Sequence, residues 1–137
     1  MKPRIYVETS VVSYLAARPS RDALVNFRQT ITSLWWDRAL QDADLFVSGL
    51  VLTEVARGDP AAARRRMAVC EELQVIGGHD DAPALAQRLI EGRLVPSTEP
   101  EDALHIAEAT LARMDYVATW NFAHFVQVAA KYRVVRA

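Results

Sequence analysis

The residue that most suggests chemistry is an acid near the N-terminus. Glu8 directly follows residues 4–7, which read as a short buried strand, and two hydroxyl residues, Thr9 and Ser10, come next. In α/β proteins, ligands bind outside the carboxyl ends of parallel strands. An acid at the end of a first strand is therefore a candidate active-site residue, and we expect the site to begin at Glu8.

Three more polar residues are candidates for the same edge of the sheet. Glu54 lies six residues past a second strand-like stretch, 45–48, on the helix side shared with the apolar residues three and four positions before it, so it can point back toward the sheet. Asn121 follows a fourth strand-like stretch, 115–119, with one residue between them. Asp102 stands in the first turn of the helix before that strand, and spacing alone leaves its position relative to the edge open.

Carboxylates that converge in a cleft repel one another and stay ionised together only if a positive charge binds among them. A few hard oxygen ligands, with room for water and phosphate oxygens, describe a Mg²⁺ or Mn²⁺ site for phosphoryl transfer. The chain has no Cys/His spacing for zinc, no Gly-rich loop after the first strand for a nucleotide, and no plausible Ser-His-Asp set. Asp115 begins the fourth strand, so we expect it at the opposite end and discard it as a ligand.

The elements that must position these residues alternate along the chain. Strands are predicted at residues 4–8, 45–48, 75–76, 115–119 and 132–135, with helices at 11–17, 20–40, 50–57, 60–73, 83–92 and 102–114 and another starting at 121–122. This alternation predicts a parallel sheet with helices on both faces, joined by right-handed crossovers.

The long helix at 20–40 carries a clear apolar pattern. Ser20 is its predicted N-cap, since serine favours that position. Trp36 falls off the apolar stripe, so it is either exposed or part of a partner surface. The stripe follows a spacing of three and four residues and is predicted to face the core. Its members are Leu24, Phe27, Ile31, Leu34 and Trp35.

Composition is that of one soluble globular domain, residues 1–137, with 51% apolar and 24% charged residues. The net charge of −1 argues against a protein that coats nucleic acid by bulk charge, although it leaves a nuclease open. No apolar run approaches the ~20 residues that span a bilayer, and no secretory signal is evident. The single cysteine, Cys70, excludes an intramolecular disulfide, and a cytoplasmic location is expected.

Four sequence blocks carry a resemblance to a known family. Residues 6–12 (YVETSVV), 51–55 (VLTEV), 102–107 (DALHIA) and 119–125 (TWNFAHF) occur in the order of the acidic blocks of PIN-domain nucleases. The third block is the most specific, and the four together span nearly the whole chain. The sequence most resembles the small PIN proteins of the VapC toxin type.

The resemblance implies a three-layer α/β/α sandwich with a short parallel sheet of four to five strands. It also implies a Mg²⁺ or Mn²⁺ site made by Glu8, Glu54 and Asp102 with help from Asn121, and hydrolysis of RNA to a 3′-hydroxyl and a 5′-phosphate. A homodimer and a small antitoxin partner of a type II pair would accompany this activity. The sequence departs from the pattern twice: Glu8 stands where Asp is commoner, and Asn121 is neutral where many members have Asp.

Candidate substrate contacts are Thr9, Ser10, Arg57 and Thr119. Thr9 and Ser10 would bind a metal water or phosphate, or else cap the next helix. Arg57, three residues after Glu54, is a candidate phosphate contact or one half of a structural ion pair. His105, three residues after Asp102, could support the site, but a satisfied helix histidine is the simpler interpretation.

Two other functions stay open. One is a PIN-like domain that has lost activity and binds RNA or a partner protein, which the neutral Asn121 would favour. The other is a small α/β signalling domain of receiver type. Against the second, the chain lacks paired acids after the first strand and a lysine at the end of the last strand.

Overall fold

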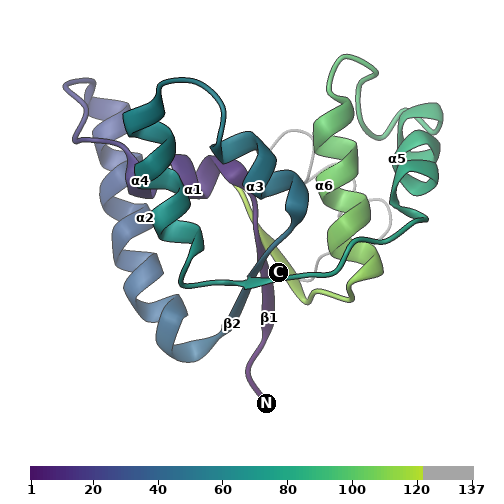
Figure 1. The fold of residues 1–137 in the computed structure, drawn as a ribbon, viewed down its shortest axis with the longest axis horizontal. Helices are drawn as coiled ribbons and strands as arrows, with labels where there is room; N and C mark the ends of the chain where they lie inside the picture. Colours follow the sequence, from purple (N-terminus) through teal and green to yellow (C-terminus); the bar gives the residue numbers. More distant parts are fainter. Residues whose placement is uncertain (122–137) are drawn as a thin grey trace.

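The computed structural model describes residues 1–121 (Figure 1). Within them, four short parallel strands form one sheet in the order β3-β2-β1-β4. The strands are β1 (Arg4–Val7), β2 (Asp44–Val47), β3 (Gln74–Val75) and β4 (Tyr116–Ala118). The helices are α1 (Thr9–Ala16), α2 (Ala23–Asp42), α3 (Gly49–Val55), α4 (Pro60–Cys70), α5 (Ala82–Glu91) and α6 (Pro100–Leu111).

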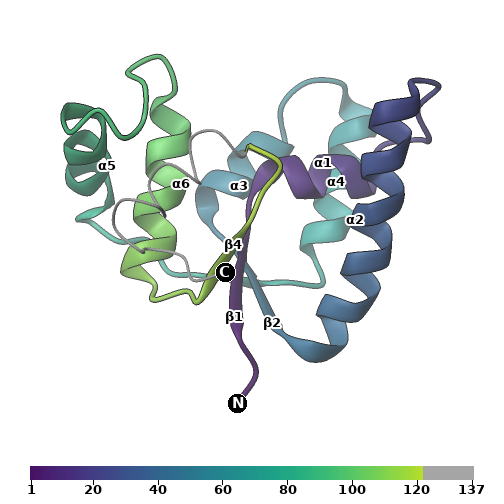
Figure 2. The same cartoon turned by 180° about the vertical axis from the view of Figure 1, so that it is seen from behind.

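The helices lie on both sides of the sheet. Figures 1 and 2 show α1, α2 and α4 on one side and α5 and α6 on the other, with the strands between them. The predicted three-layer α/β/α sandwich with a short parallel sheet is therefore confirmed. The helix predicted from Asn121 onward and the strand predicted at 132–135 extend into or lie within residues 122–137, outside the described residues.

The strand order makes β1 the centre of the sheet. The chain builds outward from β1 to β2 and β3, then returns to place β4 on the other side of β1. Such a reversal opens a crevice at the carboxyl ends of the strands, where ligands bind in open α/β sheets. The residues that follow β1 and β4 are thus the natural lining of a site.

Each helical layer has its own apolar core. On the α1/α2/α4 side, buried residues include Val12, Trp36 and Val51, and the single cysteine Cys70 is buried there as a free thiol. On the α5/α6 side, Leu89 and other small and branched residues form a second cluster. Burying apolar surface on both faces of the sheet holds the strand ends in place.

The predicted inward face of α2 is wrong. Four residues of the apolar stripe are exposed, namely Leu24 (59%), Phe27 (60%), Ile31 (40%) and Leu34 (69%), and Trp35 is half-buried. The residues that face the core are Gln29, Thr32, Trp36 and Ala39.

Polar residues can be buried on α2 because each finds hydrogen-bond partners. The Gln29 side chain accepts from the Ser20 backbone N–H (2.9 Å) and donates to the Arg18 carbonyl (3.0 Å). The Thr32 hydroxyl accepts from the Trp120 indole N–H at 3.0 Å. Counting apolar residues alone therefore picks the wrong side of this helix.

The N-cap of α2 also differs from the prediction. The cap is Asp22, whose carboxylate accepts from the Val25 backbone N–H at 2.9 Å. Ser20 lies two residues earlier, where its hydroxyl accepts from the Asp22 backbone N–H at 3.1 Å. Serine and aspartate both suit an N-cap, so local preference could not choose between them.

No helix in the described part of the chain is long and apolar enough to cross a membrane.

The observed orientation of α2 predicts a large loss of stability at one position and almost none two residues away. Trp36→Ala should lower the free energy of unfolding by about 3–5 kcal/mol, because it removes a buried aromatic side chain. Leu34→Ala should change it by no more than about 0.5 kcal/mol, because that side chain is exposed. Urea denaturation followed by fluorescence or circular dichroism measures both, and a larger loss for Leu34→Ala would contradict the observed face.

Candidate metal and active site

The residues that follow three of the strands are all polar. Glu8 follows β1, Ser48 follows β2 and Thr119 follows β4. Val7 pairs with Ala118 in register, and the Glu8 backbone N–H donates to the Ala118 carbonyl at 3.0 Å. The central strands therefore bring Glu8 and Thr119 side by side at the carboxyl edge, as the position of Glu8 predicted.

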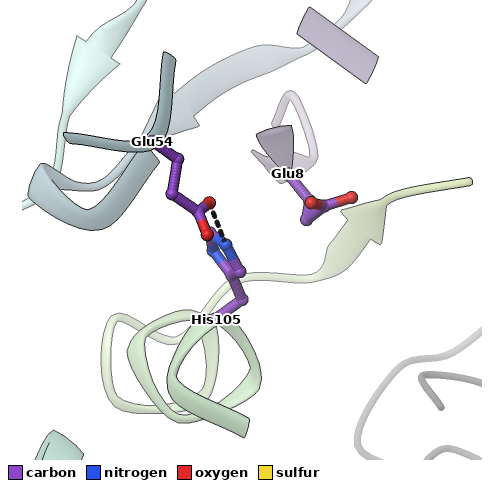
Figure 3. A group of neighbouring side chains, drawn as sticks. All are labelled: Glu8, Glu54 and His105. Carbon is purple, nitrogen blue, oxygen red and sulfur yellow. Dashed lines mark hydrogen bonds and ion pairs between the residues drawn. The ribbon is translucent and has the colours of Figure 1, made fainter. Parts of the chain in front are cut away.

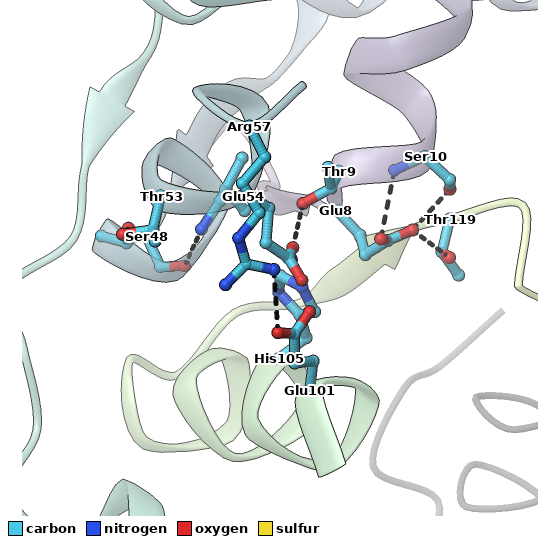
Figure 4. Close-up of polar contacts among 12 residues, drawn as sticks. Glu8, Thr9, Ser10, Ser48, Thr53, Glu54, Arg57, Glu101, His105 and Thr119 are labelled. Carbon is cyan, nitrogen blue, oxygen red and sulfur yellow. Dashed lines mark hydrogen bonds and ion pairs between the residues drawn. The ribbon is translucent and has the colours of Figure 1, made fainter. Parts of the chain in front are cut away.

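The Glu8 carboxylate is buried, with 4% of the residue exposed, and it accepts hydrogen bonds from two neighbouring segments. The Ser10 backbone N–H donates to Oε2 at 3.1 Å, which makes Glu8 the N-cap of α1. The hydroxyls of Ser10 and Thr119 both donate to Oε1, the latter at 2.7 Å (Figure 4). Ser10 in turn accepts from the Trp120 backbone N–H at 2.9 Å. Glu8 is thus held by donors from α1 and from the end of β4.

Glu54 lies in the last turn of α3 and points toward Glu8 and α6 (Figure 3). Its side chain is 12% exposed. Oε1 accepts from His105 Nε2 at 2.6 Å and from the Thr9 hydroxyl. Glu54 therefore points back toward the sheet edge, as its helical position predicted.

The surroundings of Glu54 favour its ionised form. Burial by itself would raise the pKa of Glu54, but the hydrogen bonds from His105 and Thr9 stabilise the carboxylate more strongly. The net result lowers the pKa from an ordinary 4.5 to about 2. Glu54 is an ionised acceptor at neutral pH, as a ligand for a cation must be.

Three side chains form a group that could hold a metal ion: Glu8, Glu54 and His105 (Figure 3). One ligand atom from each lies within 4.8 Å of the others. Two carboxylates suit a hard cation such as Mg²⁺ or Mn²⁺, while an imidazole nitrogen suits Mn²⁺ or a later transition metal better than Mg²⁺. The donor set therefore fits a divalent cation.

Asp102 lies in the first turn of α6, three residues before His105, and only 9% of it is exposed. It shares the helix with His105 but is not a member of the three-residue group. Its role as a third carboxylate ligand stays a prediction.

Asn121 and Arg57 are both exposed. The Asn121 backbone N–H donates to the Thr119 hydroxyl at 3.0 Å, which fixes the chain just after β4. Arg57 forms an ion pair with Glu101 across α3 and α6, at 3.0 Å between Nη1 and Oε1 (Figure 4). The structural ion pair that the sequence left open for Arg57 is therefore present.

The predicted substrate contacts Thr9, Ser10 and Thr119 all donate their hydroxyls to the two carboxylates. In the structure these hydroxyls hold Glu8 and Glu54, and their contact with a substrate stays a prediction. The capping role left open for Thr9 and Ser10 belongs instead to Glu8.

Sequence reasoning undervalued His105 and missed Tyr6. His105 is 1% exposed and contacts both Glu54 and the Tyr6 hydroxyl, at 2.6 Å in each case. Two signals were available: His105 shares a helix face with Asp102, and Tyr6 lies two residues before Glu8, on the same face of the strand. Tyr6 was predicted only as part of a short buried strand, so its hydroxyl was not considered.

Comparison with known proteins supports the fold. No family model matches the chain, and no curated protein matches it. Among solved structures, the chain is similar to a chain of VapBC2 from Rickettsia felis, solved bound to a DNA fragment from the VapBC2 promoter. The TM-score is 0.65 at 13% identity. The match covers 90% of this chain and 92% of that chain. The PIN-like fold predicted from the four blocks is therefore confirmed.

The low pKa of Glu54 predicts an acid-sensitive contribution to stability. The pKa is lower in the folded than in the unfolded chain, so the stabilisation is present above pH 4.5 and is lost as pH falls toward 2. Glu54→Gln, measured without metal and with EDTA, should flatten the fall in the free energy of unfolding over this range. Denaturant titrations from pH 7 to 2.5 measure it.

A matched control is Glu71→Gln, which removes an exposed carboxyl at the end of α4. This variant should retain the acid slope of the unchanged protein. If Glu54→Gln kept that slope as well, other carboxyls would be the cause of acid unfolding.

Proposed function

We propose that this protein is a divalent-metal-dependent endoribonuclease that hydrolyses RNA phosphodiester bonds in the cytoplasm. The observation that carries the proposal is the group of Glu8, Glu54 and His105 at the carboxyl edge of a parallel sheet. Two carboxylates there need a positive charge between them. The PIN-like fold supports the proposal that this charge is a metal ion used to cleave nucleic acid.

Glu8 and Glu54 would hold Mg²⁺ or Mn²⁺, with Asp102 and Asn121 as the further ligands implied by the family resemblance. When bound, such a cation lowers the pKa of a water and polarises a phosphate. The serine and threonine hydroxyls of the site keep the two carboxylates oriented. Arg57, at the exposed side of the site, would exchange its ion pair with Glu101 for a phosphate of the RNA.

The similar structure supports a proposal about protein partners. VapBC2 was crystallised bound to a DNA fragment from their promoter. By analogy, we propose that this chain is the toxin of a type II pair, held by a small antitoxin protein, and that it forms a homodimer. Sedimentation of the purified protein, alone and with the product of an adjacent small gene, tests both partners.

RNA cleavage should require the metal and both carboxylates. Labelled RNA is incubated with purified protein and Mg²⁺, Mn²⁺ or EDTA. Cleavage should stop in EDTA, and Glu8→Gln, Glu54→Gln and Asp102→Asn should each lower the rate about 100-fold or more, since a bound cation supplies several kcal/mol of transition-state stabilisation. Denaturing gels give the rates and the end groups.

The matched control for these variants is Asp115→Asn. Asp115 lies at the opposite end of the sheet, where its carboxylate accepts from the Arg4 backbone N–H at 2.8 Å, and an asparagine oxygen can accept the same bond. This variant should cleave at the normal rate. Cleavage that survives EDTA would contradict a metal mechanism.

A second function is favoured by one specific feature, the neutral Asn121. With one charge fewer than many relatives, the site would bind RNA or a partner protein without cutting. A folded protein that binds RNA in a gel-shift assay but cleaves none with either metal would support this alternative over the nuclease.

A further inference from the structure

A buried chain of polar side chains lies behind Glu54. The Ser48 hydroxyl and the Tyr6 hydroxyl are 2.8 Å apart, Tyr6 and His105 Nδ1 are 2.6 Å apart, and His105 Nε2 lies 2.6 Å from Glu54 Oε1. Ser48, Tyr6 and His105 are exposed by 2% or less. Figure 3 shows His105, on α6, pointing toward Glu54, on α3. Residues from β1, α6 and both ends of α3 are therefore joined by direct hydrogen bonds.

The direction of each hydrogen bond follows from its acceptor. Ionised Glu54 can only accept, so His105 Nε2 carries a proton. With a neutral imidazole, Nδ1 accepts from the Tyr6 hydroxyl, and burial, which raises the pKa of Tyr6, keeps that phenol protonated. Ser48 then donates to Tyr6 while accepting from the Val51 backbone N–H at 3.2 Å. This assignment uses the hydroxyl proton of both Ser48 and Tyr6.

We propose that Tyr6 and His105 are positioning residues that hold the Glu54 carboxylate in the direction required for metal binding, with Ser48 anchoring the chain. The inference rests on the proposed function, because it concerns the metal site of that function. His105 and Thr9 both donate to Oε1 of Glu54, which restricts rotation of the carboxylate and so fixes the direction of its two oxygens.

The hydrogen-bonded side chains of Ser48, Tyr6 and His105 orient Glu54 and do more than fill space in the core. Apolar side chains of the same shape would fill the space at little cost in stability, whereas a buried polar group must be fully satisfied. The chain also starts at Ser48, the N-cap of α3, and ends at Glu54 near the other end of the same helix. These hydrogen bonds therefore fix the position of α3 and the direction of the Glu54 carboxylate together.

Direct metal ligation by His105 is the competing role for this residue. It would require Nε2 to lose its proton and its hydrogen bond to Glu54. Both ring nitrogens are engaged, and the ring is almost fully buried. The observed contacts favour positioning.

Tyr6→Phe tests the proposal, because it removes one hydroxyl and keeps the ring. Mn²⁺ binding is measured by isothermal titration calorimetry, and thermal unfolding is measured in EDTA. Loss of a partner that orients a metal ligand costs about 10–100-fold in affinity, so the Mn²⁺ Kd should rise at least about tenfold. The matched control is Tyr14→Phe. The Tyr14 hydroxyl contacts Arg28 and is not part of the hydrogen bonds that lead to Glu54, so the Mn²⁺ Kd of this variant should stay unchanged.

A pair of substitutions at His105 gives a second test if Tyr6→Phe does not fold. His105→Gln can place an amide N–H near the position of Nε2 and should keep Mn²⁺ affinity within about threefold of the unchanged protein, whereas His105→Leu should lose about tenfold or more. Nitrogen-15 spectra of the unchanged protein should show His105 protonated at Nε2 both without and with Mg²⁺.

Each outcome has a distinct meaning. An unchanged Mn²⁺ Kd in Tyr6→Phe, with only a lower Tm in EDTA, would overturn the positioning role while leaving the proposed function intact. Loss of the Nε2 proton when Mg²⁺ binds would overturn it in favour of direct ligation. If the unchanged protein bound neither Mn²⁺ nor Mg²⁺, the proposed function itself would fail, and the inference with it.

Discussion

The repulsion between a buried and a partly buried carboxylate is the constraint on which the site depends. Glu8 and Glu54 come from different elements, and both are largely removed from water at the same edge of the sheet. Two such charges are tolerated only when hydrogen-bond donors, and ultimately a cation, surround them. Three of the segments that reach the edge supply donors to the two carboxylates. These donors are Thr9 and Ser10 at the start of α1, Thr119 after β4 and His105 on α6.

The topology of the sheet determines how these donors meet. β1 is central because the chain returns across it before adding β4, so the segment after β4 lies beside Glu8. α3 begins at the end of β2, and its length of two turns places Glu54 over the same edge. α6 packs on the other face of the sheet and places His105 against Glu54. Short strands suffice because the two apolar cores hold the layers against each other.

Most of this arrangement was predictable from local sequence. The acid after the first strand, the acid six residues past the second and the hydroxyl residue after the fourth all lie where parallel strand ends and helical periodicity put them. The part of Asp102 in the site, predicted through family resemblance, stays a prediction. His105, from the same helix, is the residue that groups with the two glutamates. A histidine on a helix has too many ordinary roles for its spacing alone to reveal this one.

Taken alone, the sequence determined the order of strands and helices, the α/β/α class and the two acids at the sheet edge. Each of these features depends on the residue pattern within one segment and on the direction of the chain, so a single segment is enough to predict it. Only the tertiary structure decided which side of α2 is buried and which hydrogen-bond donors reach Glu54. Both depend on partners distant in the sequence: Trp120 satisfies Thr32, and Tyr6 orients His105. A buried polar group is stable only with its partner present, and no single segment encodes that pairing.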